Sequence, residues 1–206
     1  MMRVSNPVEG ITVYDDVFGL EDRTDIYEAM FKINYGIGWK DHFYGAEQFL
    51  HSTWGADAWD DASLGHLDPN HFINFLRFSE PFAEFENRNL FKTVVNLTTS
   101  SDTNEGHSHR NQDVLLYYAN PEWKKEWQGE TFFLDPLGEE VIYTSLYVPN
   151  RMIRFDGNIV HRFNTQSRSA PKFRFSISTF FEKKESPEEK PKTSENTPEI
   201  TFRNIS

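Results

Sequence analysis

Six short apolar or alternating segments follow one another between residues 91 and 181, and this succession limits the fold more than any other feature. Turn residues separate them, and the segments read FKTVVNLT, DVLLYYAN, ETFFLD, EEVIYTSLYV, RMIRFDG and KFRFSISTFF. Short strands in series favour a sandwich or barrel over βαβ units. The 19 phenylalanines agree with this expectation, because aromatic and β-branched side chains are enriched in strands.

The segments before residue 91 predict a more helical part of the chain. ITVYDDVF, from residue 11, reads as a short strand, and LEDRTDIYEAMFKINYG, from residue 20, reads as a helix that ends near Gly36. Residues 37–67 lack clear periodicity, so we expect a loop with short elements there. In LDPNHFINFLRF, Asp68 suits the N-cap and Pro69 the first turn of a second helix.

The chain length and its last segment define the expected domain organisation. With 206 residues, the chain is long enough for one domain with a real core. We expect that domain to span residues 1–182, with a helical part over 1–90 and a β core over 91–182. Residues 183–206 are rich in charge and proline, so they predict a flexible tail.

Charge and cysteine content restrict the classes of partner and site. The formal net charge of −11 argues against nucleic acid or an anionic membrane as the main partner. Cysteine is absent, so a transition metal would need imidazole and carboxylate ligands. No apolar run approaches the ~18 residues of a membrane helix, and MMRVSNPVEG does not read as a signal peptide. We therefore expect a soluble cytoplasmic protein.

Two histidines stand one residue apart just before a strand-like segment, in EGHSHRNQD. Side chains two positions apart on an extended segment point the same way, so His107 and His109 would aim at one spot. If that alternation continues, Asp113 and Tyr117 share their face. This arrangement predicts a metal site near a tyrosine hydroxyl.

A third histidine and an arginine follow at the end of the β region. His161 comes after RFDGNIV, and KFRFSISTFF then alternates so that Arg174, Ser176 and Ser178 share the polar face. A guanidinium binds a carboxylate through two parallel hydrogen bonds. Arg174 on the polar face of a buried strand therefore suits a small dicarboxylate.

The order of these features resembles the Fe(II)/2-oxoglutarate-dependent oxygenases, and in particular their prolyl-4-hydroxylase-like branch. LLYYANPEWKKEWQGETFF is similar to a strand, an Asn-x-x-Trp turn and a Gly-Gly-Glu turn of that branch, and NRMIRFDGNIVHR to its segment before the distal histidine. The resemblance covers residues 91–181. It implies a mainly β fold with flanking helices (α+β), built on a double-stranded β-helix, the jelly-roll core of cupin-like proteins.

The resemblance also implies residue roles, which we carry over by position. His107 would be the first iron ligand and His161 the distal one, and Arg174 would bind the far carboxylate of 2-oxoglutarate. Ser176 completes an Arg-x-Ser pattern, and Tyr117 falls where the branch often has a tyrosine that contacts the co-substrate. The implied activity uses Fe(II), 2-oxoglutarate and O2 to hydroxylate a C–H bond of an unidentified small-molecule or peptide substrate, with release of succinate and CO2.

One position departs from the family pattern. His-x-Asp or His-x-Glu is expected, but the second residue of the pair is His109. A third imidazole keeps a nitrogen ligand and raises the net charge of the site by one unit; alternatively, Asp113 would complete the site with His109 after a local bend. The missing carboxylate also leaves two other hypotheses: a non-catalytic jelly-roll protein that binds a metal or ligand, and a halogenase-like variant, against which the bulk of His109 argues.

Overall fold

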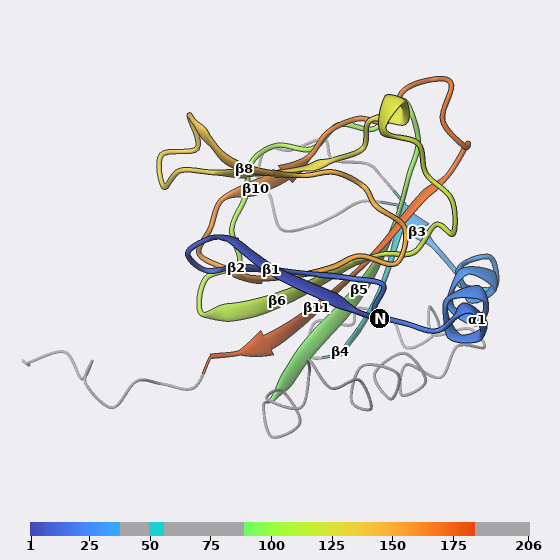
Figure 1. Cartoon of the computed structure of the whole chain (residues 1–206), viewed down its shortest axis with the longest axis horizontal. Helices are drawn as coiled ribbons and strands as arrows, with labels where there is room; N and C mark the ends of the chain where they lie inside the picture. The colour runs from blue at the N-terminus through green and yellow to red at the C-terminus, as the bar shows by residue number, and fades with distance from the viewer. Residues whose placement is uncertain (38–49, 56–88, 184–206) are drawn as a thin grey trace, which may run out of the picture.

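The computed structural model describes residues 1–37, 50–55 and 89–183 of the chain. These residues form two antiparallel sheets (Figure 1). The larger sheet has eight strands in the order β1 (Arg3–Val8), β2 (Ile11–Asp15), β9 (Met152–Asp156), β6 (Gln112–Tyr118), β11 (Arg174–Glu182), β5 (Leu90–Thr98), β4 (Leu50–Gly55) and β3 (Gly36–Ile37). The smaller sheet has the order β10 (His161–Phe163), β7 (Thr131–Leu134) and β8 (Val141–Ser145).

This arrangement confirms the predicted mainly β fold with a jelly-roll core. Each of the six segments predicted between residues 91 and 181 contains a strand. The second predicted helix, most of the loop over 37–67 and the tail beyond residue 183 lie outside the described residues. The described part of the chain contains no helix that is long and apolar enough to cross a bilayer.

The alternation of β11 gives the larger sheet two different faces. Phe175 and Ile177 belong to an apolar cluster on its outer face, whereas Arg174, Ser176 and Ser178 line a pocket on its inner face. The inner face also carries a second apolar cluster, to which the small sheet contributes Phe133. The predicted division of this strand is therefore confirmed, and it places the polar residues between the sheets.

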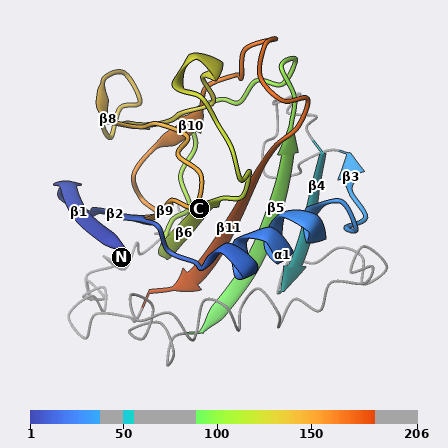
Figure 2. The same cartoon turned by 45° about the vertical axis from the view of Figure 1, so that its right-hand side comes forward.

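Helix α1 (Leu20–Met30) covers the outer face of the larger sheet, as Figure 2 shows. Ile26 and Met30 are buried, and Tyr27 packs edge-on against Phe175 with ring centroids 5.9 Å apart. The helix ends at Met30, earlier than the sequence predicted, and a short turn follows it. The helix thus supports β11 from the side opposite the pocket.

Asn150 fixes the chain segment that leads from β2 into α1. Its side chain accepts a hydrogen bond from the Phe18 amide (3.0 Å) and donates one to the Phe18 carbonyl (2.9 Å). Its own backbone has a φ of 62°, a left-handed conformation that asparagine adopts more readily than most residues. The Asn150 side chain therefore makes, with the Phe18 backbone, the two hydrogen bonds that a neighbouring strand would otherwise make.

Candidate metal centre

Main-chain hydrogen bonds hold His107 beside His161, although 54 positions separate them in the sequence. The His107 amide donates to the His161 carbonyl (3.1 Å), and the His161 amide donates to the His107 carbonyl (2.9 Å). His107 precedes β6, and His161 is the first residue of β10. These two hydrogen bonds form an antiparallel β-bridge between the segment before β6 and the start of β10, so the two histidines lie side by side.

His109 is held by the turn between β9 and β10. Its amide donates to the Gly157 carbonyl (2.6 Å), and the Gly157 amide donates to the Gln112 carbonyl (2.8 Å). A Cβ atom at position 157 would overlap the His109 carbonyl oxygen and lie only 2.6 Å from that of Gln112. Glycine is therefore required here because two carbonyl groups occupy the space of a side chain.

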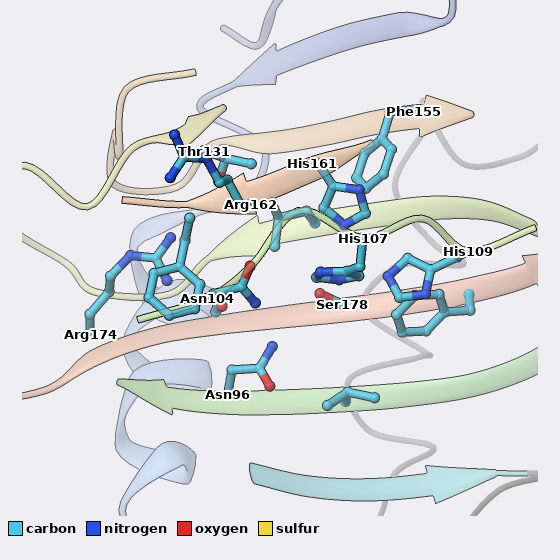
Figure 3. A pocket seen from close by; sticks show the side chains of 15 residues that line it. Asn96, Asn104, His107, His109, Thr131, Phe155, His161, Arg162, Arg174 and Ser178 are labelled. Carbon is cyan, nitrogen blue, oxygen red and sulfur yellow. The ribbon is translucent and has the colours of Figure 1, made fainter. Parts of the chain in front are cut away.

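The three imidazoles converge on one point. Their ring centroids lie 4.5 Å (His107–His161), 4.9 Å (His107–His109) and 5.1 Å (His109–His161) apart. One ring nitrogen of each lies within 4.8 Å of the others, and Figure 3 shows the three rings facing a common space. Phe155 packs against His161 (4.7 Å) and Phe180 against His109 (4.6 Å). The cluster predicted from the sequence spacing is thus formed, with aromatic rings at its sides.

Hydrogen bonds and burial prepare these imidazoles to act as ligands. Nδ1 of His161 lies 3.0 Å from the Ile159 carbonyl oxygen, and Nδ1 of His107 lies 3.2 Å from that of Glu105. Because a carbonyl only accepts, Nδ1 carries the proton in each bond, and Nε2 has the lone pair. Burial, and secondly the charge of His107, lowers the pKa of His161 to about 3. The ring is therefore neutral near pH 7, the form that a metal binds.

These donors fit a divalent transition metal. Three neutral imidazoles are ligands that Fe, Zn, Cu or Ni accepts, whereas Mg²⁺ and Ca²⁺ prefer oxygen. Asp113 does not join them: it lines a different groove, with Arg154 and Asp156. Among the described residues, the cluster contains histidines alone.

Arg174 lies at the other end of the same pocket. Its side chain is buried, with 2% of the residue exposed, and Nε donates to the Gly129 carbonyl (3.0 Å). The guanidinium lies over the rings of Tyr147 (4.8 Å), Phe163 (5.5 Å) and Tyr118 (5.6 Å). Burial lowers the pKa of Arg174, but a guanidinium stays charged in proteins. The charge of Glu130 raises the pKa of Arg174, but no carboxylate among the described residues forms a salt bridge with it, so this buried cation suits an anionic ligand.

The turn before β7 packs closely against the Arg174 side chain. Gly129 has a φ of 83°, and a Cβ atom there would lie 3.2 Å from the Arg174 side chain and from the Trp123 ring. The resemblance in LLYYANPEWKKEWQGETFF indicated a turn at this point but no contact with Arg174. A glycine shortly after the NPEW segment was the available signal that a backbone passes close to a side chain at this point.

Tyr117 does not share a face with the histidines, so that expectation was wrong. Its ring packs against Phe18 under α1 (5.2 Å), and its hydroxyl donates to Asn150 (3.3 Å). The reason is a turn at Arg110–Asn111, where Asn111 has a φ of 60°, so strand alternation does not run through from His109. The neighbouring Tyr118 faces Arg174 instead, and its hydroxyl donates to Thr131 (2.8 Å).

Two asparagines complete the pocket and were not predicted from the sequence. Asn96 lies on β5 opposite Ser176 of β11, and Asn104 lies in the loop before His107. Both line the pocket with the histidines, Arg174 and Ser178 (Figure 3). Neither stands in a recognisable motif, because their positions depend on strand register and on the path of a loop.

Comparisons with known proteins identify the fold. No protein-family model and no curated protein sequence matches the chain. Solved structures do: a prolyl hydroxylase from Trichoplax adhaerens, in complex with a hypoxia inducible factor oxygen degradation domain peptide fragment, has a TM-score of 0.60 at 13% identity, over 85% of this chain and 84% of that one.

Two further structures have the same core. A prolyl-4-hydroxylase from Pseudomonas putida has a TM-score of 0.54 at 13% identity, over 85% of this chain and 93% of that one. HygX from Streptomyces hygroscopicus, with nickel, 2-oxoglutarate and hygromycin B bound, has a TM-score of 0.56 at 8% identity, over 84% and 83% of the two chains. The chain therefore has the fold of the prolyl-4-hydroxylase-like Fe(II)/2-oxoglutarate oxygenases.

Proposed function

We propose that this protein is an Fe(II)- and 2-oxoglutarate-dependent dioxygenase that hydroxylates a C–H bond of a second substrate, with release of succinate and CO2. One observation carries the proposal: a single pocket has three converging imidazoles at one end and, at the other, a buried guanidinium that forms no salt bridge with a described residue. A metal ligand set and an anchor for a dicarboxylate are the two requirements of this chemistry.

His107, His109 and His161 would hold the iron. When bound, the iron couples the oxidative decarboxylation of 2-oxoglutarate to oxidation of the C–H bond. The protein keeps His161 neutral by burial and fixes the ring orientation through the Ile159 carbonyl. With three neutral imidazoles, the ligand set leaves the full dipositive charge of the metal at the site, which favours anionic groups beside it.

Arg174 would bind the far carboxylate of 2-oxoglutarate, with Ser176 beside it. Nε is already used by the Gly129 carbonyl, and this bond and the three stacked rings fix the plane of the guanidinium. A charged hydrogen bond is stronger where water is excluded, because the local dielectric is low. Phe155 and Phe180 line the pocket beside the imidazoles and make that end more apolar.

The proposal is tested with protein purified without oxygen. Addition of Fe(II) and 2-oxoglutarate should produce the weak visible absorption band of the iron-bound co-substrate, and exposure to O2 should then produce succinate. His161→Gln and Arg174→Gln should each abolish the band at limiting 2-oxoglutarate. Arg168→Gln, which changes an exposed arginine on the loop before β11, is the matched control and should leave it unchanged.

The two assays also separate an enzyme from a binding protein. A band followed by succinate supports the dioxygenase. If the band forms but no succinate appears under any of the oxidising or reducing conditions tried, the protein is a jelly-roll protein that binds the metal and 2-oxoglutarate without turnover. No band and no succinate would refute the proposal.

A further inference from the structure

Glu130 is a carboxylate close to Arg174 that the proposed reaction does not use. Its two neighbours in the chain both belong to the surroundings of the guanidinium. The Gly129 carbonyl accepts a hydrogen bond from Nε of Arg174 (3.0 Å), and Thr131 lines the same pocket as Arg174. The Glu130 carbonyl accepts a hydrogen bond from the Asn164 amide (2.7 Å). These contacts fix the backbone from which the Glu130 side chain projects.

One oxygen of the Glu130 carboxylate is closed off from solvent and has no hydrogen-bond partner. Oε2 is buried and accepts no hydrogen bond from a described residue. Glu126, four positions earlier, is different: 66% of its side chain is exposed, and Lys125 lies 4.0 Å from it. An anionic oxygen that is removed from water is costly unless a positive charge lies near it. The position of Glu130 therefore requires a nearby cation.

Arg174 is that cation. Burial lowers the pKa of Arg174, whereas Tyr147, Tyr118 and Glu130 raise it. Burial also raises the pKa of both tyrosines, so their hydroxyls are uncharged at neutral pH. Of the three groups, only Glu130 then brings a negative charge to the guanidinium.

The two charges act on each other without a direct bond. No salt bridge joins Glu130 to Arg174, and only Nε of the guanidinium donates a hydrogen bond to a described residue. The terminal nitrogens of Arg174 are therefore available to the carboxylate of a ligand. That carboxylate would enter the field of a second negative charge, and like charges repel.

We propose that Glu130 is an internal counter-charge of Arg174 that weakens binding of the far carboxylate of the co-substrate, and so sets the affinity of the pocket for 2-oxoglutarate. Glu130 acts through Arg174 and makes no contact with the ligand. The identity of the ligand rests on the proposed function. The coupling between Glu130 and Arg174 does not.

The first experiment measures binding of 2-oxoglutarate to the full chain by calorimetry, with Zn(II) added so that no turnover occurs. Glu130→Gln keeps the size of the side chain and removes its charge. It should lower the dissociation constant roughly ten-fold, which corresponds to about 1.4 kcal/mol and is of the order expected for separated unit charges in a partly shielded site. Glu126→Gln, which removes the same charge from an exposed side chain, is the matched control and should leave the constant unchanged. An unchanged or higher constant in Glu130→Gln would overturn the proposal.

The second experiment repeats these titrations with 2-oxopentanoate, which has a methyl group in place of the far carboxylate. Because this molecule places no charge beside Arg174, Glu130→Gln should not change its affinity. The comparison separates an effect on the far carboxylate from an effect on the fold or on the metal centre. Equal tightening of both keto acids would overturn the proposal.

The third experiment measures urea unfolding of the metal-free full chain and needs no ligand. Glu130→Gln should lower the midpoint more in the wild-type protein than in Arg174→Gln, because only the wild-type protein has the buried cation that Glu130 stabilises. An equal shift in both backgrounds would show that the two side chains are not coupled, and the proposal would then be wrong.

The outcomes separate this inference from the proposed function. If the wild-type protein binds no 2-oxoglutarate but the two substitutions are coupled in urea, Glu130 is the counter-charge of Arg174 and the proposed function fails. If the wild-type protein binds 2-oxoglutarate but Glu130→Gln does not tighten that binding, the proposed function stands and this inference fails.

Discussion

Acidification should destabilise the metal-free protein through His161. Burial lowers the pKa of this imidazole from 6.5 to about 3, so the unfolded chain takes up its proton at a higher pH than the folded protein does. Between these two values the unfolded state binds more protons, and stability therefore falls as the pH falls. The slope is about 1.4 kcal/mol per pH unit, which gives a loss of about 2 kcal/mol between neutral pH and pH 5.

Urea unfolding at pH 7.5 and pH 5.0 measures this loss, in the wild-type protein and in His161→Gln. Other groups titrate alike in both proteins, so the difference between the two pH effects isolates the imidazole. The wild-type protein should lose about 2 kcal/mol more than the variant. Equal losses would show that the folded protein protonates His161 near its ordinary pKa, and the argument for a preformed neutral ligand would then be refuted.

Substitutions at four positions test other parts of the structure. Gly157→Ala should cost about 1–3 kcal/mol in urea unfolding and weaken Zn(II) binding in calorimetry, because the new Cβ meets the His109 carbonyl; unchanged affinity would contradict this. Arg174→Gln should raise the dissociation constant of 2-oxoglutarate roughly 10- to 150-fold, the value of one charged hydrogen bond, and a change under three-fold would exclude the anchor role. His109→Asp should reduce succinate formation, because the shorter carboxylate does not reach the position of the imidazole nitrogen; faster turnover would show that the imidazole is a defect. Asn150→Ala should cost about 3–4 kcal/mol from three lost side-chain hydrogen bonds and a left-handed φ, and Asn150→Gly should recover the backbone part.

The parts of the fold that depend on local pattern were predictable from the sequence. The inward direction of Arg174 and Ser176 followed from alternation within a single strand, which needs no knowledge of its neighbours. The convergence of His107, His109 and His161 was predicted from spacing and resemblance, and the main-chain bridge now accounts for it.

The features that were not predicted depend on the backbone conformation of a single residue or on pairing with a segment that is distant in the sequence. A single left-handed residue, Asn111, ended the alternation that the sequence extended to Tyr117. The edge strand β1 was not predicted, because its pairing with β2, and not its own sequence, makes it a strand. Asn96 enters the pocket because β5 pairs with β11 in one particular register, which no local pattern encodes.

The two main-chain hydrogen bonds between His107 and His161 bear on which ligand substitutions the metal centre can accept during evolution. Those two bonds involve no side-chain atom, so the pairing of positions 107 and 161 does not depend on which side chains they carry. A ligand can then be exchanged at one position while the others keep their place. The imidazole at position 109, where the sequence pattern that this chain resembles has a carboxylate, is an exchange that such a main-chain arrangement permits.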